Sequence, residues 1–371
     1  MASGAKGGFH LNIQWYPGHM AKAKRLLMAQ LGKVDLIIEL CDARLPLSSR
    51  NPVLRNLISG KRHVLLLCKA DLAQNGKTAE WVSYFQKQGI SAMAYDKSPQ
   101  KTKQAFALIE RAAEDVLERN RRRGIQKTLR AMVVGVPNVG KSTFINRMCG
   151  SSMTKTGDRP GVTKNNQWVK VSPYFEVLDT PGMLWPKLDD QMAATRLAYI
   201  GTIKDAVYDQ YELCVCLLQD LLRAMPQSTA ERFKIKNPEA EGFALLDEVC
   251  RGRGFLLRGG EMDYDRACAV VLDEFREGKV GRLTLEEPPK PDEKPVVKTT
   301  AEPTTKPVVG SVTEPFVKSF AEPNAESVTT FAEKPAAEPV TESAARAVAE
   351  PTTKPATESA AISAGEPVQS L

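Results

Sequence analysis

The sequence predicts an α/β protein, with a doubly wound, mostly parallel sheet around a phosphate-binding loop, then a small all-helical domain and a disordered tail. Up to about residue 188, short apolar segments of strand length alternate with segments of helical spacing, as in parallel sheets. Residues 189–277 show helical spacing alone. From residue 287 onward the composition turns to Pro, Thr, Ala, Glu and Lys, which favours disorder.

Charge and proline content separate the tail from the rest of the chain. Thirteen of the 24 prolines lie beyond residue 287. From that residue on there are thirteen acidic and eight basic side chains, so the tail carries −5 and the remainder +12 of the net +7. A folded part this basic is typical of proteins that bind polyanions. We therefore expect a flexible N-terminus (1–12), a sheet domain (13–188), a helical domain (189–286) and a tail (287–371).

The composition indicates a cytoplasmic protein. No run of eighteen apolar residues occurs, so we expect no transmembrane helix. Residues 1–8 are too short and too polar for a secretory signal, and they lack the Arg-rich amphipathic length of a transit peptide. The seven cysteines lie mostly among apolar residues without CxxC spacing, which favours reduced core thiols over a zinc site or disulfides.

The first third of the chain predicts alternating strands and helices. Residues 34–41 and 64–68 are apolar runs typical of buried strands, and residues 51–58 between them have helical spacing. A strand, a helix and a strand in this order imply a parallel pair. We then expect a helix over 78–88, a strand over 90–95 and one long charged helix over about 100–123.

An apolar run at Ala131–Val134 is followed by a complete Walker A motif, Gly135–Thr143, and a helical segment, Phe144–Met148. The glycines let successive backbone N–H groups converge on one anion, Lys141 places a charge on the β- and γ-phosphates, and Ser142 offers a hydroxyl to Mg²⁺. The alternative, a chance glycine-rich turn, is disfavoured because the motif is complete and correctly placed. The nucleotide-binding residues expected here are Asn138, Val139, Gly140, Lys141, Ser142 and Thr143.

Two strands, 167–171 and 174–178, are expected after a polar, turn-rich loop at 156–163, which we expect to be mobile. The second strand ends in Asp179-Thr180-Pro181-Gly182. An apolar strand that delivers an aspartate beyond a phosphate loop is the Walker B arrangement, whose carboxylate holds the Mg²⁺ shell. Asp179 and Gly182 therefore join the expected site.

The region 189–277 predicts helices, because apolar residues recur every three to four positions, as at Leu213, Leu217 and Leu221. Its end, Arg276–Arg282, is basic and glycine-rich, and a solvated surface and an RNA contact are equally supported there. The breaks between helices are expected at Pro226, Pro238, Gly252-Arg253-Gly254 and Gly259-Gly260.

We expect Lys69-Ala70-Asp71, which follows the second buried strand, to recognise the base of the nucleotide. An aspartate at a strand end accepts from guanine N1–H and the exocyclic amine together, a pair that adenine does not present, and this favours GTP over ATP. Cys68 stands where an NKxD motif has asparagine. The lost amide contact predicts nucleotide binding weaker by about 1 kcal/mol.

These motifs are reversed relative to an ordinary small GTPase, because the base-reading element precedes the phosphate loop. Compact domains tolerate circular permutation when their termini lie close together, and the site still assembles at the carboxyl ends of the strands. The strand that carries Asp179 leads directly into the helical domain, so a movement there can be transmitted. A P-loop ATPase or nucleotide kinase and a non-hydrolysing nucleotide-binding scaffold remain alternatives.

Six segments in unbroken order carry a family resemblance: Trp15–Ala23, Asp42-Ala43-Arg44, Cys68–Asp71, Gly135–Thr143, Thr156–Thr163 and Asp179–Pro186. Together they resemble the circularly permuted ribosome biogenesis GTPase A family, also called YlqF, over about residues 13–286. The resemblance implies a circularly permuted P-loop GTPase that acts late in large-subunit (50S) assembly and binds the precursor particle, its rRNA and ribosomal proteins. It also implies hydrolysis stimulated by that particle, no membrane partner and a monomer away from the ribosome.

The resemblance also assigns roles to single residues. A lone histidine such as His19 is by itself more typical of a structural or surface position. The resemblance implies that His19 supplies catalysis, since Met183 stands where Ras-like proteins have a water-orienting glutamine. It further implies that Asn138 binds K⁺, that Thr163 reaches Mg²⁺ and that Asp96-Lys97 lies at the base, although this pair departs from the usual small polar one.

Overall fold

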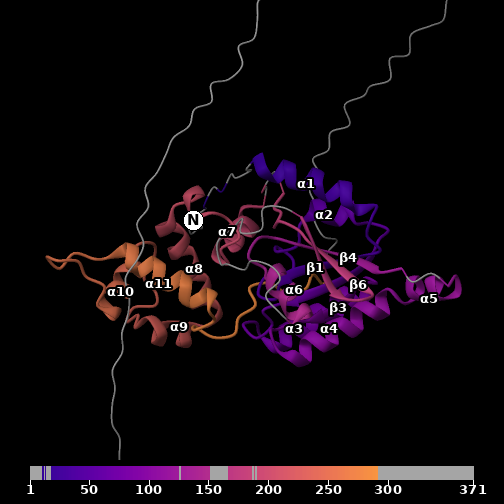
Figure 1. Cartoon of the computed structure of the whole chain (residues 1–371). Helices are drawn as coiled ribbons and strands as arrows, with labels where there is room; N and C mark the ends of the chain where they lie inside the picture. The colour runs from indigo at the N-terminus through magenta and orange to yellow at the C-terminus, as the bar shows by residue number, and fades with distance from the viewer. Residues whose placement is uncertain are drawn as a thin grey trace, which may run out of the picture. The chain divides into compact units, whose positions relative to one another are not determined.

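The computed structural model describes residues 11, 13, 18–124, 127–150, 166–185, 188 and 190–290, all within the first of two units, Met1–Lys298 and Thr299–Leu371. Six strands form one sheet in the order β3-β2-β1-β4-β6-β5 (Figure 1). Every neighbouring pair is parallel except β5 and β6. The strands are β1 (Leu36–Asp42), β2 (Arg62–Cys68), β3 (Ser91–Ala94), β4 (Leu129–Gly135), β5 (Gln167–Ser172) and β6 (Phe175–Asp179).

Strand β1 lies at the centre of the sheet, between β2 and β4, and all seven of its residues are buried. Along β2 the side chains alternate between two apolar clusters: Leu65 and Leu67 belong to one, and Val64 and Leu66 to the other. This alternation follows from the two-residue period of a strand. Both faces of the sheet are therefore covered, as a doubly wound fold requires.

Two helices of the sheet domain, α2 and α4, begin at capping side chains. Asn51 accepts from the backbone N–H groups of Val53 and Leu54 at the start of α2, and Ser98 accepts from that of Lys101 in α4. Trp81 and Phe85 of α3 are buried against the sheet. The helices of the sheet domain are α1 (Gly18–Leu31), α2 (Pro52–Leu57), α3 (Asn75–Lys87), α4 (Pro99–Ala112), α5 (Glu114–Arg122) and α6 (Lys141–Cys149).

The single long helix expected over about 100–123 is wrong, because α4 ends at Ala112 and α5 begins at Glu114. The acidic pair Glu114 and Asp115 occupies the first turn of α5, where negative charge stabilises a helix N-terminus. Asp115 also pairs with Arg62, whose Nε donates to its carboxylate at 2.6 Å. These contacts stabilise a new helix start.

After β6 all the regular elements described are helices, and α8, α9, α10 and α11 gather beside one another (Figure 1). Asp190, Asp209 and Asp263 each accept from backbone N–H groups as N-caps of α7, α8 and α11. Within the described ranges no helix is both long and apolar enough to cross a bilayer. The bounds are α7 (Gln191–Tyr199), η1 (Asp205–Val207), α8 (Gln210–Ala224), α9 (Pro226–Phe233), α10 (Ala244–Arg253) and α11 (Tyr264–Arg276).

The turn expected at Gly252-Arg253-Gly254 is shifted. Helix α10 continues through Arg253, and the chain turns only at Gly254, which caps the helix with a φ of +68°. Glycine is the residue that adopts this left-handed conformation without steric cost, so the helix ends there.

The segment after α11 returns to the sheet domain. Leu283 and Leu285 donate their backbone N–H groups to the carbonyls of Leu72 and Arg44. The buried Glu286 carboxylate accepts from the backbone N–H of Leu47 at 2.7 Å. We call residues 283–287 the return segment, and through it the chain beyond α11 contacts the loops that follow β1 and β2.

The described elements confirm the predicted fold class, an α/β sheet domain followed by helices. The expected strands and helices are found, with most bounds shifted by one to three residues. All seven cysteines are free and all but Cys149 are buried, as expected for core thiols. The loop 156–163 and the tail from residue 291 lie outside the described residues.

Glu39 of β1 forms a buried ion pair with Arg50. Arg50 Nη2 lies 2.7 Å from Glu39 Oε2, with both side chains almost fully buried, and the guanidinium lies over the Phe85 ring. Burial alone would raise the pKa of Glu39, but His63 and Arg50 beside the carboxylate lower it to about 2. A folded-state pKa below that of the unfolded chain stabilises the fold above about pH 4.5, and this stabilisation is lost as the pH falls towards 2.

We expect Glu39→Gln to lower the free energy of unfolding by about 3 kcal/mol at pH 7, because Arg50 becomes a buried, unpaired charge. The difference from the wild type should shrink between pH 6 and pH 3 in urea titrations. Glu110→Gln, at an exposed position of α4, is the control and should change neither quantity. A difference that stays constant over that pH range would contradict this assignment.

Candidate functional site

The phosphate loop connects β4 to α6 and is ordered by its own contacts. The buried Lys141 donates from Nζ to the carbonyls of Gly135 at 3.2 Å and Val136 at 2.9 Å. Burial lowers the pKa of Lys141 to about 8, although Asp179 acts in the opposite direction. Gly140, with a φ of +106°, precedes α6 and turns the backbone into its first turn. The loop and the helix N-terminus thus present the arrangement that binds a phosphate.

Beside this loop, Ser142 and Asp179 form a pair suited to a hard divalent cation. Ser142 Oγ donates to Asp179 Oδ2 at 3.0 Å. Asp179 Oδ1 is buried and accepts no hydrogen bond among the described residues, and burial raises the pKa of this carboxyl. A buried carboxylate oxygen without a partner, next to a hydroxyl, fits Mg²⁺, which prefers oxygen ligands together with phosphates.

The residues after Asp179 pack directly on the phosphate loop. A Cβ at Gly182 would lie 2.6 Å from Pro137 Cα, so only glycine permits this approach. The backbone N–H of Met183 donates to Gly135 at 3.2 Å, and the Met183 side chain is buried. Met183 stands where Ras-like proteins have a water-orienting glutamine, but its buried thioether cannot orient a water molecule.

The expected base-reading loop follows β2. Cys68 is buried at the strand end, where desolvation raises the pKa of its thiol, and Lys69 has a φ of +56°. The backbone N–H of Ala70 donates to Tyr95 at 3.1 Å, which places Asp96-Lys97 next to this loop. Asp71 is exposed, and the described part of the chain gives its carboxylate no hydrogen-bond or ion-pair partner. That carboxylate is available to a ligand.

The phosphate loop and the expected base-reading loop lie at the same edge of the sheet, where the parallel strands end. Cys68 at the end of β2 is in register with Asp42 of β1, and Gly135 at the end of β4 is in register with Leu40 of the same strand. Asp179 at the end of β6 is in register with Val133. Neighbouring strands lie about 4.8 Å apart, so β2 and β4 are separated by roughly 10 Å across β1. A nucleotide is long enough to span that distance.

The structure does not show where the side chains of two expected site residues lie relative to these loops. Thr163 lies outside the described residues, and His19 lies in α1 at a position where the structure describes only the backbone. Ile13, which precedes α1 in the chain, is nevertheless held at the start of α7. Ile13 is buried, and its backbone N–H donates to Gln191 Oε1 of α7 at 2.8 Å.

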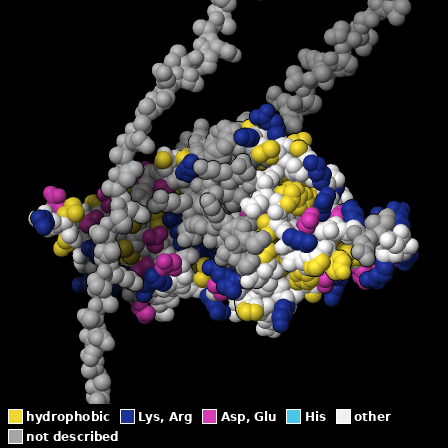
Figure 2. Space-filling view, in the orientation of Figure 1, with side chains coloured by type: hydrophobic (Ala, Val, Ile, Leu, Met, Phe, Trp, Pro, Cys, Tyr) yellow, Lys and Arg dark blue, Asp and Glu magenta, His cyan; other side chains and the backbone are white. Residues whose placement is uncertain are grey.

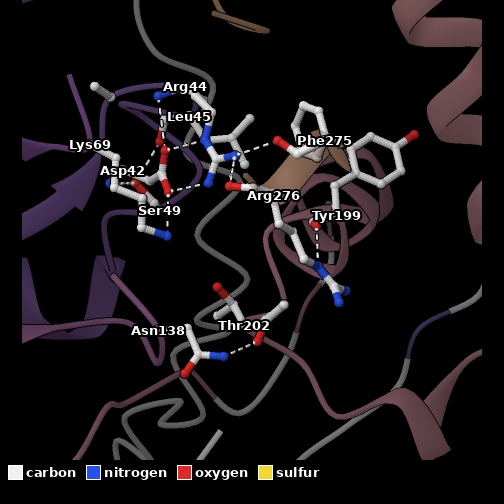
Figure 3. A network of polar contacts seen from close by, with 12 residues as sticks. Asp42, Arg44, Leu45, Ser49, Lys69, Asn138, Tyr199, Thr202, Phe275 and Arg276 are labelled. Atoms are coloured by element: carbon white, nitrogen blue, oxygen red, sulfur yellow. Dashed lines mark hydrogen bonds and ion pairs between the residues drawn. The ribbon is translucent and has the colours of Figure 1, made fainter. Parts of the chain in front are cut away.

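Sequence reasoning missed the contacts that join this site to the helical region (Figure 3). Asn138 Nδ2 donates to the Gly201 carbonyl at 2.6 Å, and Thr202 Oγ1 donates to the Pro137 carbonyl at 3.2 Å. Arg44 reaches the end of α11 and donates to the Phe275 carbonyl at 3.2 Å. The Asp42-Ala43-Arg44 triplet was visible in the sequence, but nothing in its spacing indicated this partner.

Of the two alternatives expected for Arg276–Arg282, the solvated surface is found only in part, because Arg276 is half-buried, and the RNA contact stays a prediction. Arg276 Nε donates to the Tyr199 carbonyl at 2.9 Å, and its Nη2 donates to that of Ala198 at 3.3 Å (Figure 3). Val280 of the same segment is buried, whereas Lys279 and Arg282 are exposed. Within this segment Arg276 therefore joins α11 to α7, while Lys279 and Arg282 remain at the surface.

Comparisons with known proteins agree with this geometry. The family described as "50S ribosome-binding GTPase" matches residues 130–237. Ribosome biogenesis GTPase A of Bacillus cereus is 41% identical over 278 residues, covering 74% of this chain and 94% of that relative. Mitochondrial ribosome-associated GTPase 1 of Ictalurus punctatus is 29% identical, covering 73% and 92%. The GNP-bound structure of YlqF from T. maritima is 28% identical, with a TM-score of 0.50 and coverage of 72% and 98%.

We expect Gly182→Ala to lower GTP hydrolysis at least tenfold, because the new Cβ meets the backbone of Pro137 and must displace the phosphate loop or Asp179. Gly76→Ala in α3 is the matched control, since a Cβ there meets no atom within 4 Å. Phosphate release from GTP measures both variants. Full activity in Gly182→Ala would contradict the inferred contact between Gly182 and the loop.

Proposed function

The chain belongs to the ribosome biogenesis GTPase A family of GTP-hydrolysing enzymes, and we propose that it acts in late maturation of the large (50S) ribosomal subunit. In this proposal the precursor particle stimulates hydrolysis. The observation that carries the proposal is the junction of the two nucleotide loops with the helical region, at Asn138 and at Arg44. A particle bound to the helical region can influence the nucleotide site through these contacts.

The base-reading loop recognises guanine through Asp71. In this proposal its carboxylate, which is exposed, accepts from guanine N1–H and the exocyclic amine. Cys68, Lys69 and Ala70 form the rest of this contact, and Asp96-Lys97 borders it. The Asp96 carboxylate already accepts from the backbone N–H of Ser98 at 2.8 Å, so its role at the base is to shape the loop.

The phosphate loop binds the triphosphate and its cations. Lys141 and the backbone N–H groups of Asn138, Val139, Gly140 and Thr143 hold the phosphates, with Lys141 released from the carbonyls it now contacts. Ser142, Asp179 and Thr163 hold Mg²⁺, which neutralises charge on the phosphates. A K⁺ ion next to Asn138 remains part of the proposal.

His19 supplies the group that orients the attacking water. Two observations support this role: Met183 is buried and has no group that orients water, and Ile13, before α1, is hydrogen-bonded to Gln191 of α7. An imidazole near neutral pH can accept the proton of a water molecule or orient it. Since α1 has to be positioned first, this role predicts slow hydrolysis by the isolated protein.

The partners proposed are the precursor particle with its rRNA and ribosomal proteins, in the cytoplasm, with the protein a monomer away from the ribosome. Basic side chains support an RNA partner. Figure 2 shows Lys and Arg gathered at the end of the molecule where α5 lies. The exposed arginines there are Arg119, Arg121, Arg122 and Arg123, and such clusters bind phosphate backbones.

We expect Asp71→Asn to weaken GTP binding at least tenfold and to improve binding of xanthosine triphosphate. An asparagine amide can donate to the additional oxygen that xanthine carries, whereas it cannot accept from both guanine donors. Competition titrations with a fluorescent nucleotide measure the preference. Asp96→Asn is the control at the neighbouring loop. Unchanged preference in Asp71→Asn would show that another residue reads the base.

The proposal is tested by measuring phosphate release with and without immature large subunits. We expect stimulation of about a hundredfold or more by the particle, a typical contribution of a positioned catalytic group. His19→Ala should lose most of this stimulation and keep GTP binding. The particles should co-sediment with the protein in a non-hydrolysable GTP analogue and not in GDP. Absence of stimulation would favour a scaffold role on the ribosome.

A further inference from the structure

We propose that Arg44 is a positioning residue for guanine recognition, which holds Asp42 and Lys69 in place against the C-terminal end of α11. The proposal rests on the proposed role of the Lys69–Asp71 loop and adds the group that sets its position. It assigns a function to the Asp42-Ala43-Arg44 triplet, and it makes the affinity for the nucleotide depend on the helical region.

The first step is the charge arrangement around Asp42 (Figure 3). This carboxylate is fully buried and lies between two cations. Arg44 Nη2 approaches Asp42 Oδ2 to 2.8 Å and its Nε approaches Oδ1 to 2.9 Å, which makes the pair bidentate. Lys69 Nζ lies 3.2 Å from the same Oδ2. Burial opposes ionisation of Asp42, but Arg44 and Lys69 outweigh it and hold the pKa well below its usual value.

The second step is the conformation of Lys69. Its φ of +56° lies in the left-handed region, which non-glycine residues seldom adopt. Such a conformation persists only where surrounding contacts hold it. The ion pair with Asp42 is one of these contacts, and the hydrogen bond from Ala70 to Tyr95 is another. Asp71 is two residues further on, so the orientation of its carboxylate depends on the same contacts.

The third step is the anchoring of Arg44 itself. After the bidentate contact with Asp42, its Nη1 remains, and it donates to the carbonyls of Phe275 at 3.2 Å and Arg276 at 3.4 Å. The last carbonyls of a helix have no partner within the helix and carry partial negative charge. The guanidinium also lies 5.1 Å from the centre of the Phe275 ring. Arg44 therefore joins the base-reading side of the site to the end of α11.

A second contact holds the other end of the same loop. Leu72 accepts at its carbonyl from the backbone N–H of Leu283 in the return segment. Gly278, with a φ of +76°, packs so closely that a Cβ there would lie 2.7 Å from Leu72 Cδ2. The loop from Cys68 to Leu72 is thus held at one end by α11, through Asp42 and Arg44, and at the other by the chain that follows α11. A displacement of α11 must shift this loop or break both contacts.

Lysine cannot replace Arg44 in this arrangement. The planar guanidinium directs separate donors at the carboxylate and at the helix carbonyls, whereas an ammonium group is a single point charge. Arg44→Lys retains the charge beside Asp42 and loses the fixed geometry. Because the base is common to GTP and GDP, affinity for both nucleotides should fall by the same factor.

Strand β1 offers a matched control in Arg50. Like Arg44, Arg50 is buried, forms a bidentate pair with a β1 carboxylate and lies over a phenylalanine ring. Its partners are Glu39 and Phe85, neither of which belongs to the proposed nucleotide site. Arg50→Lys therefore imposes a similar packing and charge change without touching the base-reading loop.

We expect Arg44→Lys to raise the Kd of fluorescent GDP and GTP analogues about tenfold, in titrations of the full chain with Mg²⁺. The KM for GTP should rise by the same factor, and kcat at saturation should change less than twofold. The two variants should lower the thermal unfolding temperature by similar amounts, but Arg50→Lys should leave Kd and KM unchanged. Wild-type affinity in Arg44→Lys, or equally weakened binding in Arg50→Lys, would overturn the proposal.

A second pair of variants keeps the test decisive if Arg44→Lys does not fold. Phe275→Leu removes the ring beside Arg44 and retains the backbone carbonyl, so we expect Kd for both nucleotides to rise about threefold. Phe85→Leu is its control and should leave Kd unchanged. Unchanged Kd in Phe275→Leu would overturn the proposal. Preferential binding of GTP over ATP by the wild type tests the proposed function separately.

Discussion

The carboxylate of Asp42, buried at the end of β1, is the interaction on which the rest of this structure depends. A buried charge is costly unless it is paired and hydrogen-bonded, and here Arg44 and Lys69 provide both. Each of these cations serves a different part of the molecule. Lys69 belongs to the loop that follows β2, and Arg44 contacts the end of α11. One desolvated charge therefore fixes the base-reading loop and the helical region relative to β1, and none of the three groups can move alone without leaving another unpaired.

The phosphate loop has a corresponding connection. Asn138 and Pro137 contact Gly201 and Thr202 in the turn after α7, and Arg276 from α11 contacts the carbonyl of Tyr199 in the same region. Both nucleotide loops thus contact one helical unit, the first through Arg44 and the second through Asn138. In a circularly permuted order, the strand that carries Asp179 continues into α7, so this connection is covalent as well as packed. In the proposed function, these two sets of contacts are the ones through which a partner bound to the helices would act on both loops.

Several features of the fold could be predicted from the sequence because they depend on residues close together in the chain. The apolar run before Gly135 and the lysine-serine pair after it define a strand, a loop and a helix whatever lies around them. The parallel strands place Cys68, Gly135 and Asp179 at the same edge, since every β-α-β connection brings the strand ends together. Other features were missed for an equally physical reason. The start of α5 is accompanied by the pairing of Asp115 with Arg62, 53 residues earlier, a contact that helical periodicity does not reveal.

By itself, the sequence determined the order of the motifs, the class of fold, the identity of the residues at the strand ends and the guanine preference they suggest. Only the tertiary structure decided which groups those residues contact. Arg44 and the Phe275 carbonyl are 231 residues apart, and Arg276 appeared to be a surface cation until its partners in α7 were seen. The return segment packs on the loops after β1 and β2, although most of it was assigned from the sequence to the helical domain. Local periodicity encodes secondary structure, whereas contacts between distant segments, such as those of Arg44 and Asn138 with the helical region, depend on how the whole chain packs.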